Sequence, residues 1–287
     1  MTVRPVLVVY NTHEHHGSGA PGAWLVDVVL LWPFLFAAAA YLVATAIQAR
    51  RGRRWPWFRS LFWVAGMAAA ACGFVGPIAS WSHTSFTGHM LAHLLVGMVA
   101  PLFLVLAAPV TLALRTLSVV PARRLSRLLN SVPARTVTNP VVAALLNVGG
   151  MWVVYRTALF DAMQSNALLH LIVMAHFLAA GVLYTASLVP VDPSPHRASF
   201  PLRATVLVLS LAAHGVLAKL LYAYPPPEFS AADVQLGAQL MYYGGDAVDF
   251  FLIVLLCAEL YRRTGHELRR TNPETFHPAG ALSADHR

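Results

Sequence analysis

Seven long apolar stretches with few charged residues restrict the fold of this chain more than any other feature. They cover residues 24–49, 60–81, 88–114, 141–160, 167–189, 202–224 and 239–261. A helix of about 20 residues, rising about 1.5 Å per residue, crosses the hydrocarbon core of a bilayer. Backbone polar groups in lipid must be satisfied within the chain, which favours helices over open strands. The sequence therefore predicts an all-α, polytopic membrane protein with seven transmembrane helices in a lipid bilayer.

The composition supports this class over a soluble one. Of the 287 residues, 57% are hydrophobic and only 11% are charged, whereas soluble chains carry about a quarter charged residues. The net charge of +8 would suggest a nucleic-acid partner in a soluble protein, but here basic cytoplasmic loops explain it, and we expect no nucleic-acid partner. Cys72 and Cys257 lie inside apolar stretches and predict no disulfide framework. Residues 1–10 do not resemble a signal peptide.

The distribution of basic residues predicts the orientation. With seven spans, 17 of the 20 Lys and Arg residues fall on one side, so the positive-inside rule places the N-terminus outside and the C-terminus in the cytoplasm. The predicted organisation is an extracytoplasmic, histidine-containing tail (1–23), a transmembrane domain (24–262) and a cytoplasmic tail (263–287). Residues 121–129 separate leucines from arginines and predict a basic helix on the membrane surface, with a solvated loop as the alternative.

Three histidines gather where the third apolar stretch begins. His89 and His93 are spaced i, i+4, which places both rings on one helix face, close enough to chelate one ion, and His83 lies just before them. The alternative is that these histidines only hydrogen-bond to neighbouring helices or lie at the water interface. Counting residues from the predicted outer ends places most other intramembrane polar residues in the outer half of the bundle: Asp27, His170, His176, His214, Lys219, Asp246 and Asp249.

Such a collection of polar residues in a bilayer predicts a shared site. Imidazole suits copper, zinc and haem iron, whereas carboxylates fit Cu(I) poorly. We therefore assign Asp246 and Asp249 to orienting a histidine or to pairing with Lys219. A salt-bridged network that only specifies packing is the alternative. Most methionines in the spans are expected to be packing residues, with thioether ligation possible for some of them: Met90, Met98, Met163, Met174 and Met241. The tract His13, Glu14, His15 and His16 is either a metal-capture segment or a chance cluster.

Several motifs, in this order between residues 80 and 260, are similar to those of the CtaG-type cytochrome c oxidase assembly proteins of Gram-positive and related bacteria. They are Gly88-His89-Met90-Leu91-Ala92-His93, Ala100-Pro101-Leu102, Ala108-Pro109, His176-Phe177-Leu178-Ala179-Ala180-Gly181, Val191-Asp192-Pro193-Ser194-Pro195-His196-Arg197, His214-Gly215 and, ahead of the last helix, Asp233-Val234-Gln235-Leu236-Gly237. The chain departs from the family pattern at Tyr242-Tyr243 and Gly245-Asp246, where the family has a tryptophan and then Gly-Glu; the aspartate keeps the carboxylate.

The resemblance implies a protein of the bacterial cell membrane that supplies copper, as Cu(I), to a cytochrome c oxidase subunit. Such an assembly factor or metallochaperone needs no catalytic turnover. His89 and His93 would be primary ligands, His176 and His214 further ligands and His170 a possible one. His83 would serve at the entry, and His13, His15 and His16 would capture the metal. Kinks at Pro77, Pro101 and Pro109 would allow release. A homodimer is left open.

Other functions remain as alternatives. A membrane b-type cytochrome would hold haem between histidines of two helices, such as His93 and His176. A copper transporter would need polar residues that continue into the inner half, where few occur. A zinc hydrolase would need an activated water and a nucleophile or a His-Glu-x-x-His helix, and neither is evident.

Overall fold

The computed structural model describes residues 23–189, 191–193 and 197–271, and within these ranges every regular element is a helix. In chain order the elements are α1 (Ala23–Arg50), α2 (Trp57–Phe74), α3 (Gly76–Ser82), α4 (Phe86–Leu94), the π-helical turn η1 (Leu95–Val99), α5 (Ala100–Leu106), α6 (Pro109–Thr116), α7 (Val119–Leu129), α8 (Val132–Val137), α9 (Pro140–Ala144), the π-helical turn η2 (Leu145–Gly149), α10 (Gly150–Arg156), α11 (Leu159–Ser165), α12 (Ala167–Leu188), α13 (Phe200–Ala223) and α14 (Ala231–Thr271).

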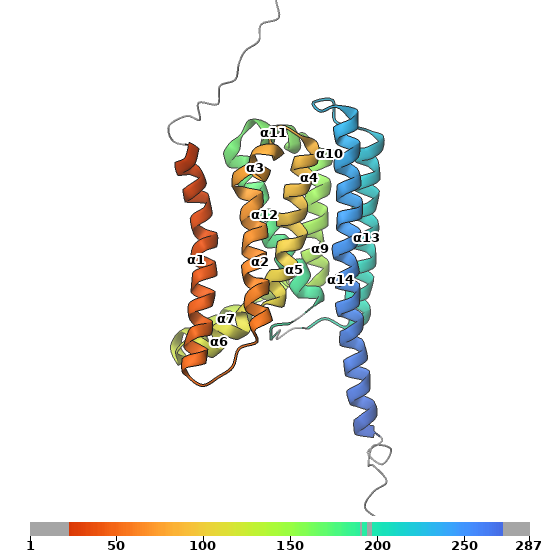
Figure 1. The fold of residues 1–287 in the computed structure, drawn as a ribbon. Coiled ribbons are helices and arrows are strands. Elements are labelled where there is room, and N and C mark those ends of the chain that lie inside the picture. Colours follow the sequence, from red (N-terminus) through yellow and green to blue (C-terminus); the bar gives the residue numbers. More distant parts are fainter. Residues whose placement is uncertain (1–22, 190, 194–196, 272–287) are drawn as a thin grey trace, which may run out of the picture.

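Among the described residues, six helices are long and apolar enough to cross a membrane, and a seventh span results when one bent pair is counted as a single span. That pair joins Pro140–Arg156 to Leu159–Ser165 at an angle of 80°, so the fourth predicted stretch is a broken helix. The prediction of an all-α membrane bundle is confirmed. α1 begins at the opposite end of the bundle from the end of α14 (Figure 1), whereas the side on which each end lies stays a prediction.

The third predicted span is shorter than expected, so its predicted end at residue 114 is wrong. The helix ends at Leu106, and the chain turns at Ala108, whose φ of 53° is left-handed. Pro109 then begins α6. The Asp192 carboxylate fixes this turn, because it accepts hydrogen bonds from the backbone N–H groups of Val110 (3.1 Å) and Thr111 (2.7 Å). α6 and α7 cross the lower end of the bundle (Figure 1), and α7, predicted as a basic surface helix, has no buried residue.

Two other boundaries also differ from the prediction. The second stretch is interrupted at Val75, and α3 then begins with Gly76, whose φ is 80°, followed by Pro77. The last helix already begins at Ala231 and not near residue 239, so Asp233 and the four residues after it form its first turns. Pro77 and Pro109 therefore each occupy the first turn of a new helix, whereas Pro101 follows the π-helical turn η1 within the continuous span Phe86–Leu106. α14 also continues past residue 262 to Thr271.

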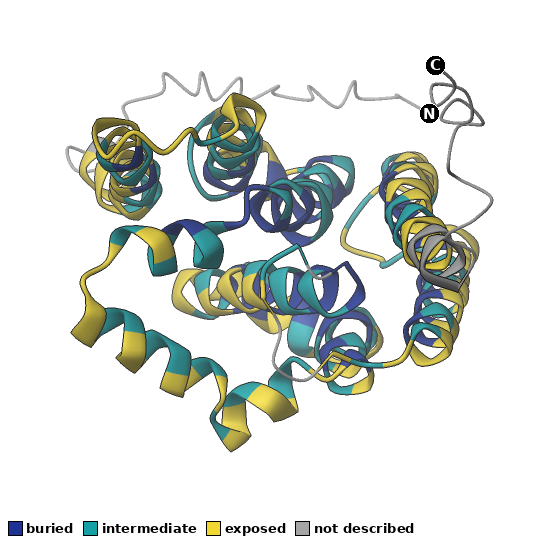
Figure 2. Ribbon diagram, turned by 90° about the horizontal axis from the view of Figure 1, so that it is seen from below, coloured by how far each residue is buried: buried dark blue, intermediate teal, exposed yellow. Residues whose placement is uncertain are grey.

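The helix formed by α4, η1 and α5 lies at the centre of the bundle. Its apolar window is 61% buried, against 6% for α1. It packs against α2, α12 and α14, while α1 lies at the edge of the bundle and packs mainly against α2 and α6 (Figure 2). The contact with α12 is close because Gly181 faces the backbone carbonyl of Gly97, a position that a Cβ atom could not share.

Candidate functional site

The N-terminal end of α4 is fixed by α14. Ser85 caps α4 by accepting a hydrogen bond from Gly88 N–H (3.2 Å). The Asp233 carboxylate of α14 accepts hydrogen bonds from Phe86 N–H (2.7 Å), Thr87 N–H (3.2 Å) and the Ser85 hydroxyl (2.9 Å). A carboxylate at these free N–H groups also interacts favourably with the helix dipole. This anchor sets the position of the helix that carries His89 and His93.

An Asp233→Ala variant should lose about 1–3 kcal/mol of stability, because it leaves several backbone donors of α4 without their acceptor. The measurement is the free energy of unfolding in detergent, with Glu228→Ala as the control. Glu228 is an exposed acidic residue in the segment between α13 and α14, and it has no hydrogen bond or ion pair to a described residue. Equal stability losses in the two variants would contradict the anchoring role.

Three histidines come together beside the start of α4 and are named here the entrance cluster: His83, His89 and His170. His83 is exposed, and its ring centroid lies 4.7 Å from that of His170 on α12. The rings of His170 and His89 are 6.1 Å apart, and His89 Nε2 lies 2.9 Å from the Tyr155 hydroxyl. His89 and His170 are buried, so the cluster leads from the surface into the bundle.

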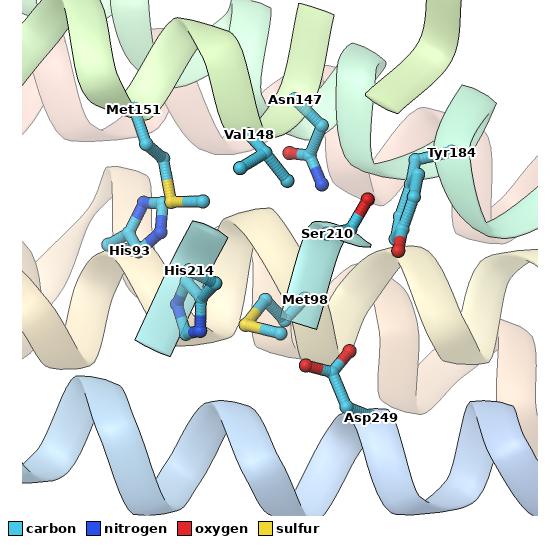
Figure 3. Close-up of a pocket in the computed structure, with 9 residues that line it drawn as sticks. All are labelled: His93, Met98, Asn147, Val148, Met151, Tyr184, Ser210, His214 and Asp249. Atoms are coloured by element: carbon cyan, nitrogen blue, oxygen red, sulfur yellow. The ribbon is translucent and has the colours of Figure 1, made fainter. Parts of the chain in front are cut away.

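One turn below His89, His93 lines a small space between the helices that is named here the inner cavity. Its volume is about 20 Å³, and its walls are His93, Met98, Asn147, Val148, Met151, Tyr184, Ser210, His214 and Asp249. In Figure 3 the Met151 thioether points towards the His93 ring, and Met98 lies between His214 and Asp249. Five segments meet there: α4 with η1, the η2–α10 segment, α12, α13 and α14. Such a space admits one water-sized particle.

The π-helical turn η1 explains how Met98 reaches this cavity. In a regular α-helix, residues five apart point about 140° away from each other. A π-turn bonds residue i to i+5, as Ala100 N–H does to the Leu95 carbonyl, and so brings such residues close to one face. Pro101 favours the turn, because it has no N–H and its ring would clash with the Gly97 carbonyl of a regular helix. The turn therefore places Met98 on the His93 side.

Several buried imidazole nitrogens have no hydrogen-bond partner among the described residues: Nδ1 of His89 and His170, and Nε2 of His93 and His214. His93 and His214 are only 3% and 4% exposed. A buried, unsatisfied polar atom costs about 1–3 kcal/mol, so four in one region need an explanation, and a bound ligand is one.

The structure separates the remaining predicted site residues from this region. His176 is on the outer face of α12, where its Nε2 lies 3.0 Å from the Leu146 carbonyl of η2. Lys219 and Asp246 are both exposed, and the Lys219 ammonium lies 5.1 Å from the Tyr242 ring centre. Neither Asp246 nor Asp249 bonds to Lys219 or to a histidine in the described part of the chain. His13, His15 and His16 lie outside the described residues.

No group of three or more His, Cys, Asp or Glu side chains within the described ranges is arranged to hold a metal ion. Methionine is not one of these four residue types, so this statement does not cover the thioethers of Met98 and Met151 in the cavity wall. Met151 was not among the residues expected from the sequence, nor was Tyr155. Asn147, a polar residue in an apolar stretch, was the available signal for the wall formed by η2 and α10.

The fold and this region define the class of protein: a multi-pass helical membrane protein with buried imidazoles at the centre of its bundle. A family model for the cytochrome c oxidase caa3 assembly factor (Caa3_CtaG) matches residues 39–263. The chain therefore belongs to this family of oxidase assembly factors, as the motifs predicted, and it is a multi-pass protein of the bacterial membrane.

The chain is also similar to longer curated proteins. Uncharacterized proteins of Mycobacterium bovis and Mycobacterium tuberculosis are each 32% identical over 198 residues, and one of Mycobacterium leprae is 28% identical over the same length. These alignments cover 67% of this chain but only 30% of each relative. No solved structure matches the chain.

Proposed function

We propose that this protein binds copper, as Cu(I), in the outer half of the membrane and supplies it to a subunit of a cytochrome c oxidase during assembly. The observation that supports the proposal is a series of histidines that leads from the surface to the centre of the bundle. It passes from His83 through His170 and His89 to His93 and His214. Imidazole suits copper, and a metal that is handed on can move between neighbouring ligands of one kind.

The geometry favours this function over haem binding. A space of about 20 Å³ is far below the hundreds of Å³ typical of pockets for cofactor-sized ligands. His93 faces this space, whereas His176 is on the outside of α12, so these two histidines do not form an axial pair. A transporter is also disfavoured, because an apolar cluster that includes Leu102, Leu188 and Leu252 packs between helices of the bundle.

The test is the metal content of the full chain, purified under reducing conditions and measured by mass spectrometry. We expect near-stoichiometric copper in the wild type and its loss in the His89→Ala/His93→Ala double variant. The matched control is His176→Gln, which changes an imidazole outside this series and should retain copper. Absence of copper from the wild type, or iron with a sharp Soret band, would overturn the proposal.

A further inference from the structure

We propose that the inner cavity is a binding site for one Cu(I) ion, with His93, His214, Met98 and Met151 as its ligands. This inference rests on the proposed function, since it names the site at which the copper is held. It assigns two thioethers to the ligand set. The entrance cluster, which has only imidazole nitrogen donors, then becomes the route to this site and not the site itself.

The donor atoms around the cavity determine which metal ion fits it. Thioether sulfur is a soft ligand that selects Cu(I), and imidazole also suits copper, whereas Mg²⁺, Ca²⁺ and Mn²⁺ favour oxygen ligands. Met98 and Met151 come from different segments, η1 and α10, yet both sulfur atoms point into one space (Figure 3). Two imidazoles and two thioethers match the preferences of Cu(I) better than those of Zn²⁺, whose sites use thiolate, imidazole and carboxylate.

Burial and size support the same assignment. His93 and His214 are each more than nine-tenths buried, and within the described residues Nε2 of both rings is without a partner. Both line the cavity, so a metal there would satisfy two nitrogen atoms that otherwise carry an unmet desolvation cost. The volume of about 20 Å³ admits a single ion and excludes an organic ligand.

The charge of the cavity also fits a monovalent cation. Asp249 is 4% exposed and is the acidic residue of the cavity wall, whereas Asp246, one turn earlier, is exposed. A lone charge in a low-dielectric interior is costly unless it is paired. One carboxylate beside one Cu(I) ion gives a neutral site, which explains the acidic residue without making it a ligand.

The experiment titrates the purified full chain with Cu(I) under reducing conditions against a chromophoric Cu(I) chelator. The Met98→Leu/Met151→Leu variant should bind Cu(I) at least about 10-fold more weakly than the wild type, because even the loss of a group outside the ligand set typically weakens metal binding about 10- to 100-fold. The control is Met163→Leu/Met241→Leu. Both of these methionines are 1% exposed, and neither lines the cavity.

X-ray absorption of the copper-loaded wild type provides a second measurement that needs no variant. Sulfur together with nitrogen in the first coordination shell supports the site, and a shell of nitrogen alone overturns it. If the wild type binds Cu(I) and the Met98→Leu/Met151→Leu variant binds equally well, this inference fails while the proposed function stands. If the wild type binds no Cu(I), the proposed function fails as well.

Discussion

A Glu259→Gln variant is expected to lose about 3–5 kcal/mol of stability, because it leaves a buried arginine without its counter-charge. The Arg203 side chain is completely buried, and its guanidinium donates two hydrogen bonds of 2.9 Å to the Glu259 carboxylate. It also donates to the Leu188 carbonyl at 2.6 Å. These contacts join α12, α13 and α14 at the end of the bundle opposite the entrance cluster. Chemical unfolding in detergent measures the loss.

The matched control is Arg263→Ala. Arg263 also pairs with Glu259, at 3.0 Å, but its side chain is 45% exposed, so its removal should cost no more than about 1 kcal/mol. Replacing Arg203 together with its partner, as Arg203→Met/Glu259→Met, should be less destabilising than Glu259→Gln, since no buried charge is then left unpaired. A double variant that is less stable than the single one would contradict this account.

The Gly245→Ala variant should weaken Cu(I) binding by about 10-fold or more, although it removes no proposed ligand. A Cβ at Gly245 would overlap Cε1 of His214 and lie 3.0 Å from its Nδ1. The ring must therefore move, and a displaced imidazole cannot keep its place in the wall of so small a cavity. The Cu(I) competition titration measures the effect.

Gly149→Ala is the control for this prediction. It makes the same change within a membrane-spanning segment, where a Cβ would meet nothing within 4 Å. Its Cu(I) affinity should equal that of the wild type. Wild-type affinity in the Gly245→Ala variant would show that His214 can move without consequence, which conflicts with a role as ligand.

The membrane bundle could be predicted from the sequence because long apolar stretches have only one stable solution in lipid. The ends of the helices were harder to predict from the sequence, because they depend on single tertiary contacts. The third span ends at Leu106 and not at residue 114 because Asp192, some 80 residues later, caps the next helix. Nothing near residue 106 in an apolar sequence signals that contact.

The candidate site was predicted only in part for a similar reason. The i, i+4 spacing of His89 and His93 is a local property, and both are buried in α4 as a pair of that kind should be. Which face each neighbouring helix turns towards the site is not a local property, because it depends on how the helices pack. Two π-turns change the angular register, so Met98 turns into the bundle. His176, at a depth that suggested a ligand, instead faces outward and contacts the Leu146 carbonyl.

α14 is much longer than a helix needs to be to cross a membrane. Its 41 residues span about 62 Å at 1.5 Å per residue, roughly twice the hydrocarbon thickness of a bilayer, and Figure 1 shows it reaching beyond the other helices. The same unbroken rod carries Asp233 at the start of α4, Asp249 at the cavity and Glu259 in the ion-pair group. These three contacts therefore keep fixed spacings along one helix, so a shift of α14 along its axis would displace all three together.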